Sequence, residues 1–112
     1  MKNKYTFTII TCTISNFEKL IRLIKSLKNQ SYRNFELIII DQSNEDKIKQ
    51  LQKCKIPIKY IRSKEKGLSR SRNIGIKLSK GKYLLFTDDD CYFNVNFLYQ
   101  IKNAYKRYKT DL

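Results

Sequence analysis

Four apolar runs are spaced along the chain, and each has the composition of a β-strand. Tyr5 to Thr11 (YTFTIIT) is rich in β-branched and aromatic residues, and Phe35 to Ile40 (FELIII) is almost continuously apolar. A continuous apolar run is typical of a parallel strand that is covered on both faces. Ile58 to Ile61 follows Pro57 as a third, weaker strand, and Tyr83 to Thr87 is the fourth. The pattern therefore predicts a sheet of four short strands.

Helical periodicity separates these runs. Ser15-Asn16-Phe17-Glu18 matches a capping box, and apolar residues then recur every three or four positions as far as Leu27. A weaker helix is predicted over Asp46 to Lys53. Strands that alternate with helices imply right-handed crossovers, so we expect an α/β fold with a mostly parallel sheet and flanking helices.

Two further helices are marked by the residues at their ends. Ser69 is placed to cap a helix that contains Ile74, and Gly81 is placed to stop it. Asn94 or Asn96 begins a final helix, in which apolar side chains again recur on one side.

Polar side chains follow three of the predicted strands. These segments are Thr11 to Ser15, Asp41 to Asn44, and Asp88 to Asp90. Ligands of open parallel sheets bind beyond the carboxyl ends of the strands. We therefore expect the three segments to converge on one edge of the sheet.

Length and composition indicate one globular domain. The chain has 112 residues, of which 41% are hydrophobic and 30% charged. No apolar run approaches the roughly 20 residues that a membrane helix needs, and no signal-peptide core adjoins the start. A cytoplasmic location is expected.

Cysteine and histidine usage limits the chemistry. The three cysteines form no C-x-x-C pair, which argues against a disulfide framework and a thiolate zinc site. The chain has no histidine, which excludes histidine-based catalysis and histidine-ligated metals. Any metal is therefore expected to be held by oxygen.

The chain is strongly basic, with 24 Lys and Arg residues against 10 Asp and Glu, a formal net charge of +14. Such a charge is compatible with a nucleic-acid or anionic-membrane partner. It is equally compatible with a solvated surface, which the even dispersal of lysine favours.

Three consecutive aspartates follow the fourth strand despite this positive charge. In an extended segment, Asp88 and Asp90 would point to one side about 6.5 Å apart, with Asp89 opposite. Two carboxylates at this spacing suit Mg²⁺ or Mn²⁺ bound to a substrate diphosphate. A solvated loop or a helix-capping cluster is the alternative, but the position after a buried strand favours the metal.

A loop that leads into a helix forms a second candidate site. Gly67-Leu68-Ser69-Arg70-Ser71-Arg72-Asn73-Ile74-Gly75 places arginines near a helix N-terminus, where amide donors and the helix dipole favour phosphate. The alternative is a capped helix whose arginines pair with acidic side chains. Gly75 costs up to about 1 kcal/mol within a helix, which indicates close packing. Asp41 could bind a nucleobase or ribose, or could cap the turn that follows it.

These segments, in this order, resemble the N-terminal half of the family 2 glycosyltransferases, which have the GT-A fold with a Rossmann-like nucleotide-binding half. The resemblance runs from about Phe7 to Phe93, through TIITCTISNFEKLIRLIKSLKNQSYRNFELIIIDQSNED and KGLSRSRNIGIKLSKGKYLLFTDDDCYF. It implies a nucleotide-sugar donor, a Mn²⁺ or Mg²⁺ ion, and inverting transfer of the sugar to an acceptor hydroxyl.

The resemblance also implies roles for residues. Substrate-binding positions are Thr13, Ser15, Asp41, Gly67, Arg72, Asn73, Asp88 and Asp89, and metal-binding positions are Asp88 and Asp90. The nucleoside would be bordered by Asp41 and by the loop after the first strand, Cys12 to Ser15, which includes Thr13. Asp90 would contact the metal directly, and Asp88 would lie by the ribose or a metal-bound water. The metal would act as a Lewis acid on the departing diphosphate.

The chain departs from the family pattern at several points. Ile14-Ser15 stands where Tyr-Asn is common, and Gln42 stands where a second Asp is frequent. The family needs a later Asp or Glu as general base, and the chain ends about one helix beyond the aspartates. Residues 1–112 are therefore expected to be a donor-binding half, inactive alone, that lacks the acceptor half and the catalytic base.

Partners follow from the same resemblance. It implies a donor such as a UDP-sugar, a glycan or glycolipid acceptor of the cell envelope, and no nucleic acid. The positive charge would favour the inner face of a membrane, and uncovered apolar surface would favour self-association. The alternatives are a basic nucleic-acid or anionic-surface module, whose binding would ignore the aspartates, and a nucleotidyltransferase, for which an early Gly-rich loop is missing.

Overall fold

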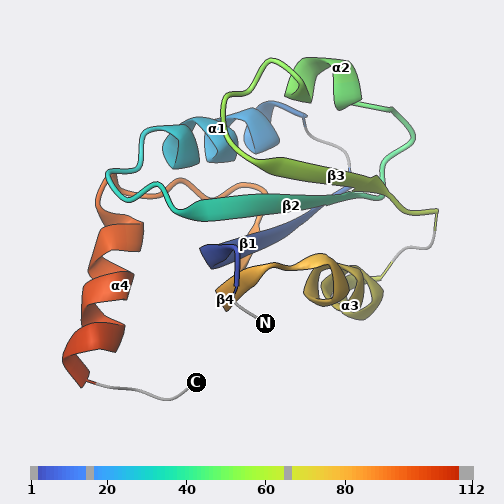
Figure 1. Cartoon of the computed structure of the whole chain (residues 1–112). Helices are drawn as coiled ribbons and strands as arrows, with labels where there is room; N and C mark the ends of the chain where they lie inside the picture. The colour runs from blue at the N-terminus through green and yellow to red at the C-terminus, as the bar shows by residue number, and fades with distance from the viewer. Residues whose placement is uncertain (1–2, 15–16, 65–66, 109–112) are drawn as a thin grey trace.

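The computed structural model describes residues 3–14, 17–64 and 67–108, and these residues form one four-stranded parallel sheet (Figure 1). The strands are β1 (Tyr5–Thr13), β2 (Phe35–Asp41), β3 (Ile58–Arg62) and β4 (Gly81–Asp88). Their order across the sheet is β3-β2-β1-β4, and every neighbouring pair is parallel. The predicted parallel α/β fold is confirmed. Every residue of β2 is buried, as its continuous apolar composition predicts.

Helices cover both faces of the sheet. They are α1 (Phe17–Lys28), α2 (Ile48–Leu51), α3 (Leu68–Leu78) and α4 (Phe97–Tyr108). In Figure 1, α1 and α2 lie on one side of the sheet and α3 lies on the other. None of the described helices is long and apolar enough to cross a membrane.

The alternation of side chains along the central strands divides the core into two layers. Ile9 and Leu37 belong to the larger layer, which packs against α1 and also contains Leu98 of α4. Ile10 and Ile38 belong to the smaller layer, which packs against α3. Because successive side chains of a strand point to opposite faces, residues adjacent in sequence contact different helices.

Two predicted helix boundaries are wrong. Ser69 lies within the first turn of α3, which begins after Gly67 at a φ of 145° and has no side-chain cap. Gly81 does not stop α3 but begins β4, where a Cβ would collide with the backbone of Thr8. Glycine is favoured both after the end of a helix and where two backbones approach closely. Here the close approach of β1 places Gly81 at the start of β4. The predicted capping box at Ser15 and Asn16 lies outside the described residues.

The predicted close packing at Gly75 is confirmed. A Cβ on this residue would lie 2.5 Å from Cγ2 of Ile10 on β1. The glycine thus lets α3 approach the sheet closely, and α3 carries Arg72 to the carboxyl edge.

Gln30 orients the segment that leaves the aspartates. Its side-chain amide donates to the carbonyl of Asn94 (2.6 Å), and its carbonyl oxygen accepts from the backbone N–H of Leu98 (3.1 Å). The second bond satisfies one of the unpaired amides in the first turn of α4. Gln30 therefore attaches the start of α4 to the end of α1, on the same face of the sheet.

Candidate functional site

Three strands of the sheet end together at its carboxyl edge. Thr13 at the end of β1 is paired with Asp41 at the end of β2, and Cys12 is paired with Asp88 at the end of β4. The structure thus brings the predicted polar segments to one edge. Cys12 and Thr13 are the last two residues of β1, whereas the sequence pattern placed them in the loop after it.

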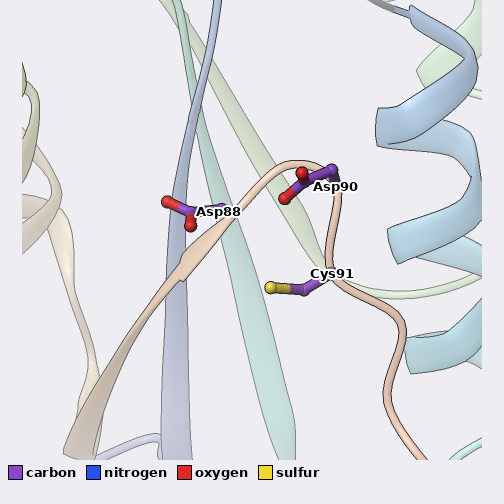
Figure 2. A group of neighbouring side chains, drawn as sticks. All are labelled: Asp88, Asp90 and Cys91. Carbon is purple, nitrogen blue, oxygen red and sulfur yellow. The ribbon is translucent and has the colours of Figure 1, made fainter.

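Asp88, Asp90 and Cys91 form a compact cluster at this edge, as Figure 2 shows. One carboxylate oxygen of each aspartate and the sulfur of Cys91 all lie within 4.8 Å of one another. The extended geometry expected for the aspartates is wrong, because β4 ends at Asp88 and the chain turns at Asp89 and Asp90. The turn, with a bond from the Cys91 N–H to the Asp88 carbonyl (3.3 Å), brings the donor atoms closer together.

Asp89 does not belong to this cluster. Its carboxylate accepts a hydrogen bond from the hydroxyl of Thr13 over 3.0 Å, across 76 positions of the chain. Thr13 is fully buried, so the aspartate is fixed to the end of β1. This contact leaves Asp88 and Asp90 on the exposed side of the turn.

The donor set of the cluster fits a divalent cation. Two exposed carboxylates supply the hard oxygen ligands that Mg²⁺ and Mn²⁺ prefer, with room for water and phosphate oxygens. Cys91 also places a sulfur within the same group, and the expectation that oxygen alone holds a metal stays a prediction. Cys91 was not identified from the sequence, because only the turn after Asp88 brings its sulfur to the carboxylates.

A cavity of about 420 Å³ adjoins the cluster. It lies between β1, β4, the start of α3 and the segment after the aspartates, and its wall includes Cys12, Ser71, Arg72, Asp88 and Cys91. The cavity therefore combines an apolar wall with a carboxylate, a guanidinium, a hydroxyl and two thiols.

Arg72 lies at the exposed side of this cavity. Its guanidinium carbon is 5.3 Å from the centre of the Phe86 ring, a cation–π arrangement that orients the planar group. The guanidinium therefore presents its fork of donors on the wall that also contains Asp88.

Gln42 and Ser71 hold the start of α3 against the sheet. The amide of Gln42 donates to the carbonyl of Gly67 (3.2 Å) and to the hydroxyl of Ser71 (2.6 Å). Ser71 in turn contacts the sulfur of Cys12 at 3.5 Å. Gln42 stands where the resembled family often has an aspartate, and a carboxylate could not donate either bond. The sequence did not identify Ser71, whose role arises from this long-range contact.

Asp41 is fully buried, and its carboxylate is surrounded by donors. It accepts from the Tyr60 hydroxyl, from the Ser43 N–H (2.8 Å) and from the buried Lys47 ammonium (3.4 Å). Burial by itself would raise the pKa of Asp41, but the Ser43 and Tyr60 hydrogen bonds and the Lys47 charge together lower it below its usual value. Neither Lys47 nor Tyr60 was identified from the sequence, and the nucleoside contact of Asp41 stays a prediction.

The remaining predicted site residues lie in different environments. Gly67 is exposed and directs its carbonyl at Gln42 and Ser71. Asn73 is exposed on α3 and does not belong to the cavity wall. Ser15 lies outside the described residues.

Comparisons with known proteins give the class of this fold and site. The family model described as glycosyl transferase family 2 matches residues 8–112. Poly(ribitol-phosphate) beta-N-acetylglucosaminyltransferase TarP of Staphylococcus aureus is 33% identical over 112 residues, which cover 94% of this chain and 34% of TarP. The chain spans about a third or less of the length of TarP and of four uncharacterized glycosyltransferases that it also matches.

Solved structures share the fold. TarS of S. aureus in complex with UDP-GlcNAc has a TM-score of 0.83 at 24% identity, over 99% of this chain and 33% of that chain. The mannosyltransferase PcManGT of Pyrobaculum calidifontis, in complex with GDP-Man and Mn²⁺, has a TM-score of 0.71 at 16% identity, over 80% of this chain and 29% of that chain.

The chain belongs to glycosyltransferase family 2, and its sheet and flanking helices have the GT-A, Rossmann-like arrangement. Both the predicted family and the predicted fold are confirmed.

Proposed function

We propose that residues 1–112 form the donor-binding part of a metal-dependent glycosyltransferase, which binds a UDP-sugar and transfers the sugar, with inversion, to an acceptor hydroxyl. The observation that carries this proposal is the pair of exposed carboxylates, Asp88 and Asp90, of which Asp88 lines a cavity that Arg72 also borders. Membership of family 2 supports the same chemistry.

Asp88 and Asp90 would hold a Mn²⁺ or Mg²⁺ ion, with Asp90 in direct contact. An ion bound there would neutralise charge on the departing diphosphate. Mn²⁺ in the PcManGT complex supports a metal at a site of this fold. The chain has a formal net charge of +14, so most of its surface attracts anions. The two carboxylates make this site attract a cation instead.

Arg72 would bind a diphosphate oxygen through its guanidinium fork, which the Phe86 ring orients. The UDP-GlcNAc in the TarS complex supports a donor whose nucleotide is UDP. We propose that Thr13, Ser15 and Asp41 border this nucleoside, and that Gly67 and Asn73 border the donor from the start of α3. In that arrangement Asp88 and Asp89 complete the wall nearest the ribose.

The acceptor would bind to a part of the protein beyond this donor-binding part, and the general base would come from there. The relatives are about three times as long or longer, which is compatible with such a second part. TarP, which acts on poly(ribitol-phosphate) by its name, supports a cell-surface polysaccharide or glycolipid as the product. We propose a cytoplasmic location at the inner face of the membrane, to which the basic surface would be attracted.

Calorimetry with UDP tests this proposal. We expect UDP to bind the chain only when Mn²⁺ or Mg²⁺ is present, and we expect Asp90→Asn to weaken that binding by about tenfold or more, since it removes a charged ligand. Glu45→Gln, the same change at an exposed site outside the cavity wall, is the matched control and should leave the affinity unchanged.

UDP binding that is equal with and without metal, or equal in Asp90→Asn and the unmodified chain, would overturn the proposal. Binding to nucleic acid or anionic vesicles that falls steeply with salt and ignores both substitutions would instead support the basic-module alternative.

A further inference from the structure

Cys91 packs against the edge of the larger core layer, but its sulfur also lies beside two carboxylates. Its sulfur lies within 4.8 Å of carboxylate oxygens from both Asp88 and Asp90, and in Figure 2 the side chains of Asp90 and Cys91 both extend toward Asp88. The thiol is half-buried, so it also remains accessible from the cavity that it borders. A cysteine that served only to fill apolar space would gain nothing from two neighbouring carboxylates.

We infer that Cys91 is a third protein ligand of the divalent ion, and that its sulfur gives the site a preference for ions softer than Mg²⁺. The inference rests on the proposed function, in which Asp88 and Asp90 hold that ion. Two oxygens and one sulfur on one side of the ion leave its remaining positions for water or phosphate oxygens. Sulfur ligands favour borderline and soft ions such as Zn²⁺ and Cd²⁺, whereas Mg²⁺ accepts them poorly.

The other cysteines are differently placed. Cys12 borders the same cavity, but its sulfur contacts the Ser71 hydroxyl at 3.5 Å and lies outside the Asp88, Asp90 and Cys91 group. Cys54 packs against the larger core layer, as Cys91 does, but it lies outside this group, and burial raises the pKa of its thiol despite the nearby Lys28. These two residues are therefore matched controls for Cys91.

Titration with Cd²⁺ alone tests the inference, because sulfur bound to Cd²⁺ gives an ultraviolet charge-transfer absorption that oxygen ligands do not. We expect this absorption in the unmodified chain, in Cys12→Ser and in Cys54→Ser, and we expect its loss in Cys91→Ser. The Cd²⁺ affinity of Cys91→Ser should fall by at least about tenfold, the lower limit for loss of even an outer partner of a metal site.

A second variant measures the preference itself. Cys91→Asp exchanges the sulfur for a carboxylate, so we expect it to bind Mg²⁺ more tightly than the unmodified chain while it loses the charge-transfer absorption. Circular dichroism of both variants, with the unmodified spectrum expected, shows that the fold is retained. An absorption that survives in Cys91→Ser, or that disappears in Cys12→Ser instead, would overturn the inference.

UDP titration in parallel separates this inference from the proposed function. If UDP binds in a metal-dependent way but Cd²⁺ absorption does not depend on Cys91, the sulfur ligand is refuted and the donor site stands. If Cd²⁺ absorption depends on Cys91 but UDP does not bind, the metal site stands and the donor proposal fails.

Discussion

The hydroxyl of Thr13 donates a hydrogen bond of 3.0 Å to the carboxylate of Asp89, and this contact sets the direction of the aspartate turn. Thr13 is buried at the end of β1, so Asp89 is held against the sheet. Its two neighbours, Asp88 and Asp90, are left to converge with Cys91. A side chain that takes no part in the cluster therefore organises it.

Thr13→Val should loosen this turn. The substitution keeps the shape of the side chain but removes the donor, so we expect the free energy of unfolding to fall by about 1 kcal/mol. We also expect weaker metal binding, because Asp88 and Asp90 would no longer be held together. Chemical denaturation and Mn²⁺ titration measure the two effects.

Thr11→Val is the matched control, two residues earlier on the same strand. The Thr11 hydroxyl is fully buried and has no hydrogen-bond partner among the described residues. The same substitution should therefore be neutral or stabilising there, since it removes an unsatisfied polar group. Equal losses of stability in both variants would contradict the role of the Thr13 bond.

Arg72→Ala should weaken the binding of UDP with Mn²⁺ by about tenfold, because a hydrogen bond to a charged group is lost. Arg72→Lys should give an intermediate affinity, since lysine keeps the charge but not the planar fork. Arg72 is exposed, so the free energy of unfolding should change by less than about 0.5 kcal/mol. Calorimetry measures the affinities, and Arg70→Ala on the same helix, outside the cavity wall, is the control. If both alanine variants lose the same affinity, bulk charge rather than Arg72 explains it.

Gly75→Ala should destabilise the protein by about 1 to 3 kcal/mol, the usual cost of overpacking. Helix propensity alone predicts the opposite sign, a gain of up to about 1 kcal/mol. The new methyl group would lie 2.5 Å from Cγ2 of Ile10, and that collision outweighs propensity. Thermal or chemical unfolding decides the sign. In an Ile10→Ala background, which removes the colliding atoms, Gly75→Ala should become neutral or stabilising, and a double-mutant cycle detects this coupling.

Tyr60→Phe should lower the free energy of unfolding at neutral pH by about 2 kcal/mol, because the buried Asp41 carboxylate loses a donor. Burial and the Asp41 hydrogen bond raise the pKa of Tyr60 from 10.0 to about 12. Below pH 10.0 both folded and unfolded states keep the phenol proton, so the contribution of Tyr60 is complete. As the pH rises toward 12 the unfolded state releases its proton first, and that contribution is lost.

The difference in stability between the unmodified chain and Tyr60→Phe should therefore shrink over this alkaline range. Denaturation at a series of pH values measures it, and a constant difference up to pH 12 would contradict the raised pKa.

Asp41 should give a second pH dependence, in the acid range. Because its pKa in the folded state is lowered from 3.8, its ionised carboxylate stabilises the fold at pH values above 3.8. This stabilisation is lost as the pH falls through the pKa of the folded state.

The elements of the fold could be predicted because their signals are local. The continuous apolar run of β2 and the periodic face of α1 depend on residues within one strand or helix, and both elements lie where the pattern predicts. The boundaries of the elements also depend on contacts between distant segments. Gly81 suits a helix end and a strand start equally well, and only the neighbouring Thr8 of β1 distinguishes them.

The candidate site could be predicted only in outline. Parallel strands align their carboxyl ends, so the aspartates after β4 were expected near the ends of β1 and β2. The bond between Tyr60 and Asp41 joins residues that are 19 positions apart, and no local pattern marks it. Cys91 was missed for a similar reason, because its importance depends on how tightly the chain turns after Asp88.

The sequence by itself determined the strands, the helices and the residue types available for chemistry, since backbone propensity and side-chain periodicity act over a few residues. The tertiary structure alone decided that Thr13 holds Asp89, that Gln42 holds the start of α3, and that a sulfur joins the two carboxylates. Strand register and turn geometry set these contacts, because they determine which distant side chains come within hydrogen-bonding distance.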